Sequence, residues 1–122
     1  CNKQIKKGRS GIKECIEYIE KGCSVALMID QRLGEGDRVK FFNEEAHTTS
    51  LPAQLSLKYN LKIVPIFIER EHKDSFKMKI YEPINTSNFK NKSELTLKLN
   101  QILENMISKN PNQWIWTHDR WK

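Results

Sequence analysis

Residues 24–32 read Ser-Val-Ala-Leu-Met-Ile-Asp-Gln-Arg, a nearly continuous apolar run that ends in three polar residues. Such a run is typical of a strand that is buried on both faces of a sheet. Polar groups at the C-terminal edge of these strands often face the ligand crevice of an α/β protein. We therefore expect a strand over residues 24–30, with Asp30, Gln31 and Arg32 at its edge.

The segment before this run has helical spacing over residues 11–21, whereas residues 1–10 are polar and resemble a loop. Ser10 is suited to cap the start of the helix, and Lys21-Gly22 is suited to end it, with a cation in the last turn and then a glycine. The spacing predicts one apolar face, made of Ile12, Cys15, Ile16 and Ile19.

The segments after the run alternate between helices and strands. Residues 33–50 form a long connection, which we interpret as a functional loop. A helix is expected from Thr49 or Ser50, with Pro52 in its first turn, to about Tyr59. Residues 61–69 predict a second buried strand, although Pro65 is awkward inside it, and residues 76–82 predict a half-buried edge strand.

The last predicted helix covers about residues 93–108 and is stopped by Asn110-Pro111. The element order is then helix, strand, helix, strand, strand, helix and tail, which indicates an α/β protein with a mixed sheet flanked by helices. The apolar face of this last helix comprises Leu95, Leu99, Ile102, Leu103, Met106 and Ile107.

The composition is that of a globular protein, with 122 residues, 38% hydrophobic and 30% charged. The net charge of +6 favours nucleic acid, anionic lipid or phosphorylated substrates as partners, without choosing among them. No stretch is apolar enough to span a bilayer. Cys1, Cys15 and Cys23 fit no zinc pattern, so we expect three reduced thiols, no metal site and no cofactor.

Three clusters are candidates for function. In the first, Asp30 is suited to orient a cation or a histidine, and Arg32 to bind a phosphate; the alternative is an ordinary polar strand exit. In the second, Lys40 and Phe41, between Arg38 and Phe42, combine cations with aromatic rings as at a membrane interface. The alternative is that the two rings only pin a long loop to the core.

The third cluster is the tail, where three tryptophans lie close to Arg120. They fit an interface or a cation–π packing unit; the alternatives are a cover for the core or a platform for single-stranded nucleic acid. No RRM, KH or helix-turn-helix signature supports the nucleic-acid alternative. The tryptophans are Trp114, Trp116 and Trp121.

The usual catalytic motifs are missing from the sequence. His47, His72 and His118 are the only histidines, and none has a carboxylate five positions later, so there is no H-x4-D/E pair. There is also no G-x-S-x-G and no phosphate-binding G-x-x-x-x-G-K-[ST]. The residues themselves therefore do not supply a complete active site.

Several segments, in order, resemble the lipid A biosynthesis (lauroyl/myristoyl) acyltransferases. They are the apolar run that ends in Asp30-Gln31, then Phe41-Phe42 with Ala46 and Thr48 as in F-F-G-x-x-A-x-T, then Ile63-Val64-Pro65-Ile66 as in V-P-V, and finally the ending similar to W-x-W-x-H-x-R-W-K. Two positions depart from the family pattern: Asn43 replaces a glycine, although asparagine tolerates left-handed geometry, and Asp119 is unusual between His118 and Arg120.

The resemblance implies a fold shared with glycerolipid acyltransferases and a transfer of a fatty acyl chain from acyl carrier protein to a hydroxyl of a lipid A precursor. It places the chain at the cytoplasmic face of the bacterial inner membrane, with no nucleic-acid partner. Residues 1–122 correspond to the C-terminal part of one acyltransferase domain, whose H-x4-D/E base lies before the part seen here. In that family Asp30 would organise the active site, and an arginine upstream in the sequence could form an ion pair with it.

The same resemblance implies that four residues contact the substrate: Gln31, Arg32, Lys40 and Phe41. It also implies a tail that binds the membrane or has a structural role, formed by Trp114, Trp116, Arg120 and Trp121. Two other classes of protein stay open. One is a non-catalytic basic α/β module that binds anionic membrane or nucleic acid, for which binding should weaken with salt. The other is a degenerate relative that serves as a scaffold.

Overall fold

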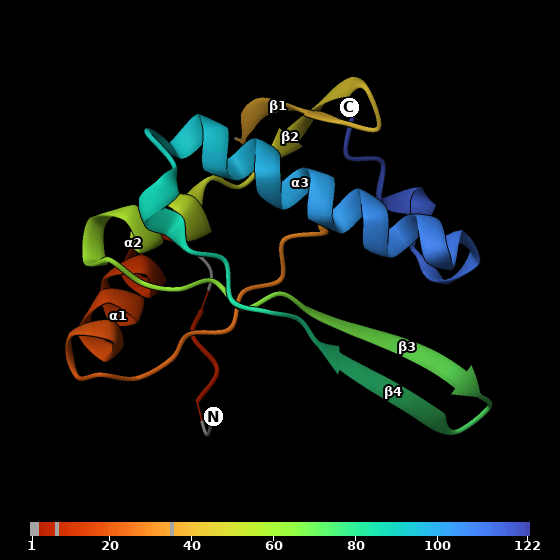
Figure 1. Cartoon of the computed structure of the whole chain (residues 1–122), viewed down its shortest axis with the longest axis horizontal. Helices are drawn as coiled ribbons and strands as arrows, with labels where there is room; N and C mark the ends of the chain where they lie inside the picture. The colour runs from red at the N-terminus through yellow and green to blue at the C-terminus, as the bar shows by residue number, and fades with distance from the viewer. Residues whose placement is uncertain (1–2, 7, 35) are drawn as a thin grey trace.

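The computed structural model describes residues 3–6, 8–34 and 36–122 and shows three helices with two separate β-hairpins (Figure 1). The long helix α3 crosses the molecule, with α1 and α2 near one of its ends. The α/β class is confirmed. The expected single mixed sheet is wrong for the described residues, because each sheet is a two-stranded antiparallel hairpin.

Helix α1 covers Arg9–Glu20, so it begins earlier than predicted, and Ser10 lies inside it rather than at its cap. The cap is Gly8, whose φ of 108° is accessible to glycine without strain. The predicted stop is confirmed: Gly22 has a φ of 79°, and the Cys23 N–H donates to the Tyr18 carbonyl at 2.9 Å.

Helices α2 and α3 cover Leu51–Tyr59 and Lys92–Lys109, close to the predicted ranges. Pro52 lies in the first turn of α2, where its missing N–H costs no helical bond. At the start of α3 the Asn91 side chain accepts from the Glu94 N–H at 2.9 Å, and Asn110 caps the end before Pro111.

Strands β1 (Asp37–Phe41) and β2 (Glu44–Thr48) form an antiparallel hairpin within residues 33–50, where a loop was expected. That prediction was wrong because the turn has an unusual sequence. Phe42 and Asn43 both have positive φ, at 51° and 65°, and positive φ at both central residues is the geometry of a type I′ turn. A distant contact also secures the turn, since the Phe42 N–H donates to Glu104 Oε1 at 2.8 Å.

Residues 24–30 do not form the predicted strand; they run as an extended segment without strand pairing. Their apolar side chains are not buried on two faces either, since Met28 is 80% and Leu27 is 39% exposed. A strand needs a neighbour that pairs with its backbone N–H and C=O groups, and no described strand takes that position.

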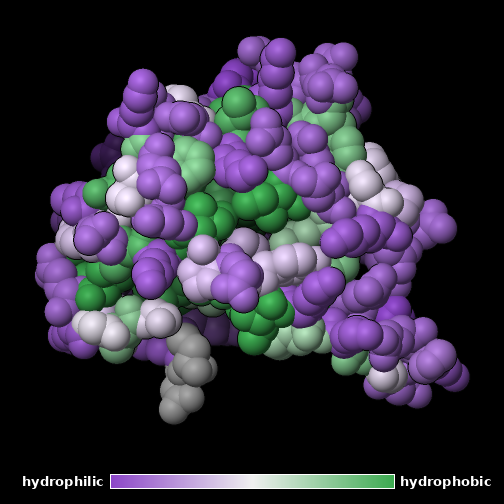
Figure 2. Space-filling view, viewed as in Figure 1, coloured by the Kyte–Doolittle hydropathy of each residue, from purple (hydrophilic) through white to green (hydrophobic). Residues whose placement is uncertain are grey.

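Strands β3 (Ile66–His72) and β4 (Ser75–Ile80) form the second hairpin, which projects from the body of the molecule (Figure 1). β3 begins only after Pro65, whose carbonyl still accepts from the Tyr81 N–H at 3.0 Å. The expected burial of both strands was wrong: Ile68 and its partner Met78 are 57% and 60% exposed. Figure 2 shows hydrophobic side chains near the centre of one face and hydrophilic ones over the outer part of this arm.

The core consists of two clusters along α3. In the first, Phe41 and Ala46 of the β1–β2 hairpin pack against Leu103 and Ile107. In the second, Ala53 of α2 packs against Leu95 and Leu99. Ile29 contacts both clusters, so the extended segment before Asp30 is held at the junction between them.

Candidate functional site

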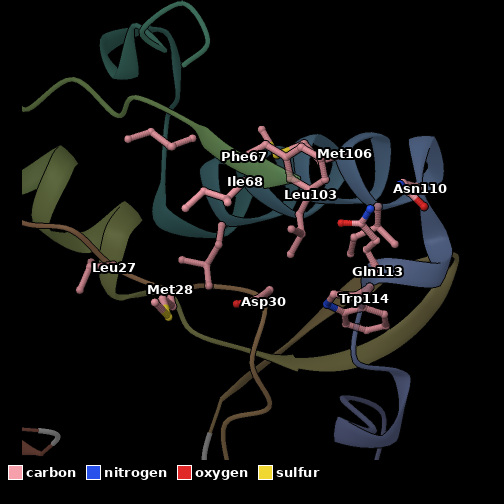
Figure 3. Close-up of a pocket in the computed structure, with 13 residues that line it drawn as sticks. Leu27, Met28, Asp30, Phe67, Ile68, Leu103, Met106, Asn110, Gln113 and Trp114 are labelled. Atoms are coloured by element: carbon pink, nitrogen blue, oxygen red, sulfur yellow. The ribbon is translucent and has the colours of Figure 1, made fainter. Parts of the chain in front are cut away.

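A pocket of about 300 Å³ lies between the extended segment 27–30, β3 and the C-terminal half of α3 (Figure 3). Its volume is at the lower end of the range for sites that bind small molecules. Most of its lining is apolar, with Phe67 and Ile68 from β3 and Leu103 and Met106 from α3. The arrangement suits an apolar ligand that carries a polar group at one end.

Asp30 is the carboxylate in the lining of this pocket, and Figure 3 shows it between the labelled side chains of Met28 and Trp114. It is partly buried and makes no hydrogen bond to a side chain or backbone group that the structure describes. Asp30 thus lines a pocket, although the strand edge to which the sequence assigned it does not form, and its role in an active site stays a prediction.

Gln31 and Arg32, the two residues that follow Asp30, do not line the pocket. Gln31 is partly buried, with Nε2 at 3.9 Å from Met28 Sδ, and Arg32 is exposed to solvent. Arg32 lies within electrostatic reach of Asp119, because its charge contributes to lowering the pKa of that carboxyl, although the hydrogen bond from Lys122 is the larger cause.

Lys40 and Phe41 also lie away from the pocket. Phe41 is fully buried and stacks on Trp121, with 5.6 Å between ring centroids. Substrate contact by the Phe41 side chain is thus a wrong prediction, and the alternative of an aromatic pin is the better description. Lys40 is exposed on the other face of β1, as the alternation along a strand requires.

The tail folds onto the β1–β2 hairpin as an aromatic cluster around Phe41. Trp114 approaches Phe41 edge-on at 5.7 Å, and the Trp121 Nε1–H donates to the Phe41 carbonyl at 3.2 Å. Trp116 is 45% exposed, and neighbouring Ile115 is 68% exposed. The tail therefore combines a structural part with an outer apolar part, which leaves both predicted roles available.

Arg120 is fully buried inside this cluster, with Cζ at 4.1 Å from the centroid of the Phe41 ring. Its Nη2 donates to Thr48 Oγ1 at 3.1 Å and to Asn100 Oδ1 at 3.3 Å. The Asn100 amide is oriented in turn by donating to the Lys40 carbonyl at 3.0 Å. The network fixes the position of the guanidinium from two strands and one helix.

Two nitrogens of this buried guanidinium, Nε and Nη1, have no hydrogen-bond partner among the described residues. Burial lowers the pKa of Arg120, and the negative charges of Asp30 and Glu104 act in the opposite direction. A buried cation with unmet donors is costly. Arg120 is therefore a buried cation with donors that the described residues leave without partners.

Thr48 and Asn100 were not predicted from the sequence as members of this network. The position of Asn100 between Leu99 and Leu103 on α3 could have indicated a buried polar residue, and the structure shows that it is only 1% exposed. A buried amide on an apolar helix face requires a polar partner. The identity of that partner, Arg120, could not be read from the helix alone.

Other candidate groups remain separate from the pocket. Cys15 is buried and Cys23 exposed, both as free thiols, while Cys1 lies outside the described residues. In residues 3–6, 8–34 and 36–122 no group of three or more His, Cys, Asp or Glu side chains is placed to hold a metal ion. No helix in those ranges is long and apolar enough to cross a bilayer.

The chain is an α/β protein in which the pocket that contains Asp30 is mostly apolar. The chain belongs to the bacterial lipid A biosynthesis acyltransferase family, because the model of that family matches residues 1–122, its entire length. The expectation drawn from the resemblance is thereby confirmed at the level of the family. A comparison with curated proteins finds no match.

Proposed function

We propose that this acyltransferase moves a fatty acyl chain from an acyl carrier protein thioester to a hydroxyl group of a lipid A precursor. The observation that carries the proposal is the apolar pocket with Asp30 in its lining. Burying an acyl chain yields about 0.8 kcal/mol for each methylene group, so even half a chain in this pocket would give substantial affinity.

In this proposal Asp30 organises the polar end of the site rather than acting as the base. The sequence has no H-x4-D/E pair, so the imidazole that takes the proton from the acceptor hydroxyl would come from residues other than these 122. A carboxylate next to that imidazole would hold it in the productive tautomer and stabilise its positive charge.

A place at the cytoplasmic face of the inner membrane is part of the same proposal. The net charge of +6 would attract anionic lipid headgroups, and the partly exposed Trp116 and Ile115 could enter the interfacial region. The phosphates of a lipid A precursor would be attracted by the same positive field, with exposed Arg32 and Lys40 as candidate contacts.

The experiment is a transfer assay with the complete gene product, labelled acyl carrier protein thioester and a lipid A precursor. Asp30→Asn keeps the size of the side chain and removes its charge, and we expect transfer to fall by about 100-fold or more. Glu17→Gln on the exposed face of α1 is the matched control. Unchanged transfer by the Asp30 variant would remove the assigned role.

The donor is tested by replacing acyl carrier protein with coenzyme A. We expect slower transfer from acyl coenzyme A, because it lacks the protein surface that the basic chain would contact. No transfer from either thioester by the complete gene product would refute the proposed activity. It would favour the second candidate, a basic module without chemistry, whose binding to anionic vesicles should weaken with salt.

A further inference from the structure

The arm formed by β3 and β4 turns a row of apolar side chains toward solvent. They share one face of the hairpin, because residues directly opposite each other in an antiparallel pair lie on the same face. Each is between 52% and 65% exposed, and exposed apolar patches of this kind mark interaction sites. We call this surface the apolar arm face. It consists of Ile66, Ile68, Phe76, Met78 and Ile80.

The charge that belongs to the apolar arm face is positive. Arg70 pairs with Phe76 across the hairpin, and its Cζ lies 4.4 Å from the centroid of that ring. Glu69 lies on the opposite face, and Glu71 forms an ion pair with Lys77 at 3.2 Å. The two residues of the turn carry one charge of each sign. An apolar face with a cation at its rim complements a surface of anionic lipid headgroups.

The apolar arm face continues into the pocket that contains Asp30. Ile66 and Ile68 belong to this face, and both also line the pocket (Figure 3). Met28, from the extended segment that forms another wall, is 80% exposed. The pocket therefore opens to solvent beside apolar side chains, and an apolar path leads from the arm into its interior.

Hydrogen bonds hold the arm to the tail. The Gln113 side chain accepts from the Arg70 N–H and donates to the Arg70 carbonyl, both at 2.8 Å. A neighbouring strand makes the same pair of bonds to one residue, so this amide occupies the free edge of β3 at Arg70. The exposed residues Ile115 and Trp116 follow shortly after Gln113. The arm is thus fixed to the part of the tail that the proposed function turns toward the membrane.

We propose that the apolar arm face docks on an anionic lipid bilayer and thereby places the opening of the pocket at the membrane surface. Lipid is the occupant because the face carries a cation at its rim and continues into a pocket that suits an acyl chain. The inference rests on the proposed function, because it names the surface through which a lipid substrate would reach the pocket.

A second copy of the chain is the competing occupant, since two such faces could cover each other about a twofold axis. The two occupants predict different measurements. Docking on lipid predicts binding to vesicles that depends on the arm. Docking on a second copy predicts a dimer in solution that substitutions on the arm convert to a monomer.

The experiment measures co-sedimentation of the native chain with vesicles of phosphatidylglycerol and phosphatidylcholine. We expect Met78→Asp to weaken binding by about 10-fold or more, because a charge replaces an apolar side chain that would be buried in lipid. Met78→Ser adds no charge and should weaken binding by about threefold to tenfold. Ser10→Asp, at the exposed start of α1 and away from the arm in Figure 1, is the matched control for the added charge.

Ile80→Asp serves as the second variant if Met78→Asp does not fold, and circular dichroism tests the fold of each. Equal binding of the native chain and the folded arm variants, or no binding by the native chain, would overturn the inference. A dimer that the arm variants dissociate without loss of vesicle binding would also overturn it.

The transfer assay separates this inference from the proposed function. Vesicle binding that depends on Met78, without acyl transfer by the complete gene product, would refute the proposed activity alone. Acyl transfer together with vesicle binding that ignores the arm variants would refute the docking surface alone.

Discussion

Arg120 Nη2 lies 3.1 Å from Thr48 Oγ1, and this bond joins residues 72 positions apart in the sequence. Thr48 ends β2, and Arg120 lies two residues before the end of the tail, so the bond closes the tail over the hairpin. Thr48 Oγ1 also accepts from Asn100 Nδ2 at 3.1 Å. One hydroxyl therefore ties together a strand, a helix and the tail.

Asn100→Ala tests the energetic weight of this network. We expect a loss of roughly 1–3 kcal/mol in the free energy of unfolding, because the change removes an acceptor from a buried cation and a donor from the Lys40 carbonyl. Chemical denaturation measures it. Asn105→Ala, on the exposed side of the same helix, should change the value by less than about 0.5 kcal/mol. Equal effects of the two variants would contradict the network.

Phe41→Ala tests the centre of the aromatic cluster. The ring is 0% exposed, and we expect a loss of about 3–5 kcal/mol from the lost burial and the cavity left behind. Phe76→Ala is the matched change at a ring that is 58% exposed on β4, where a cost below about 1 kcal/mol is expected. Thermal unfolding of both variants gives the comparison, and a small effect at Phe41 would argue against a core position.

Asn43 tests the turn between β1 and β2. Its φ of 65° is left-handed, so a β-branched residue there should cost about 1–2 kcal/mol. We expect Asn43→Val to lower the free energy of unfolding by this amount, and Asn43→Gly to leave it unchanged or raise it slightly. If Asn43→Val is as stable as the native chain in urea titration, the turn has a different backbone geometry.

The ion pair between Asp37 and Lys92 predicts a dependence of stability on pH. The hydrogen bond from Lys92 Nζ, 2.9 Å from Asp37 Oδ2, is the largest cause of the lowered pKa of Asp37. Because the pKa is lower in the folded state, the pair stabilises the protein above the unfolded-state pKa of about 3.9, and the effect is lost as the pH falls through the folded-state value.

Lys92→Met should therefore lower the free energy of unfolding by about 0.2–1 kcal/mol at neutral pH, a range that allows for solvent screening since both side chains are 46% exposed. The difference from the native chain should disappear at acidic pH. Urea titrations at several pH values measure it, with Lys98→Met in the middle of α3 as the control. A difference that persists after Asp37 is protonated would rule out the ion pair as its cause.

Local signals in the sequence predicted the helices well. The spacing Leu95, Leu99, Leu103 and the stop at Asn110-Pro111 located α3 to within one residue at each end. Pro52 and Gly22 marked a helix start and a helix stop for steric reasons that act within a few residues. Asp30, predicted as a site residue from its position after an apolar run, lines the pocket, and its role stays a prediction.

The hairpins and the polar network could not be predicted in the same way. The turn at Phe42 is held by Glu104, and Arg120 is held by Thr48 and Asn100, all through contacts between residues far apart in the chain. The run at residues 24–30 has the composition of a strand, but composition cannot supply a neighbour with which to pair.

The amino-acid sequence was thus enough for the α/β class, the family resemblance and the approximate ranges of the helices, because each depends on neighbouring residues or on an ordered set of short motifs. The pairing of the strands, the burial of Phe41 and the hydrogen bonds that hold Arg120 required the folded chain. Those features arise when segments that are distant in the sequence pack together and exclude water. The free energy of that packing depends on both segments, so neither segment alone predicts it.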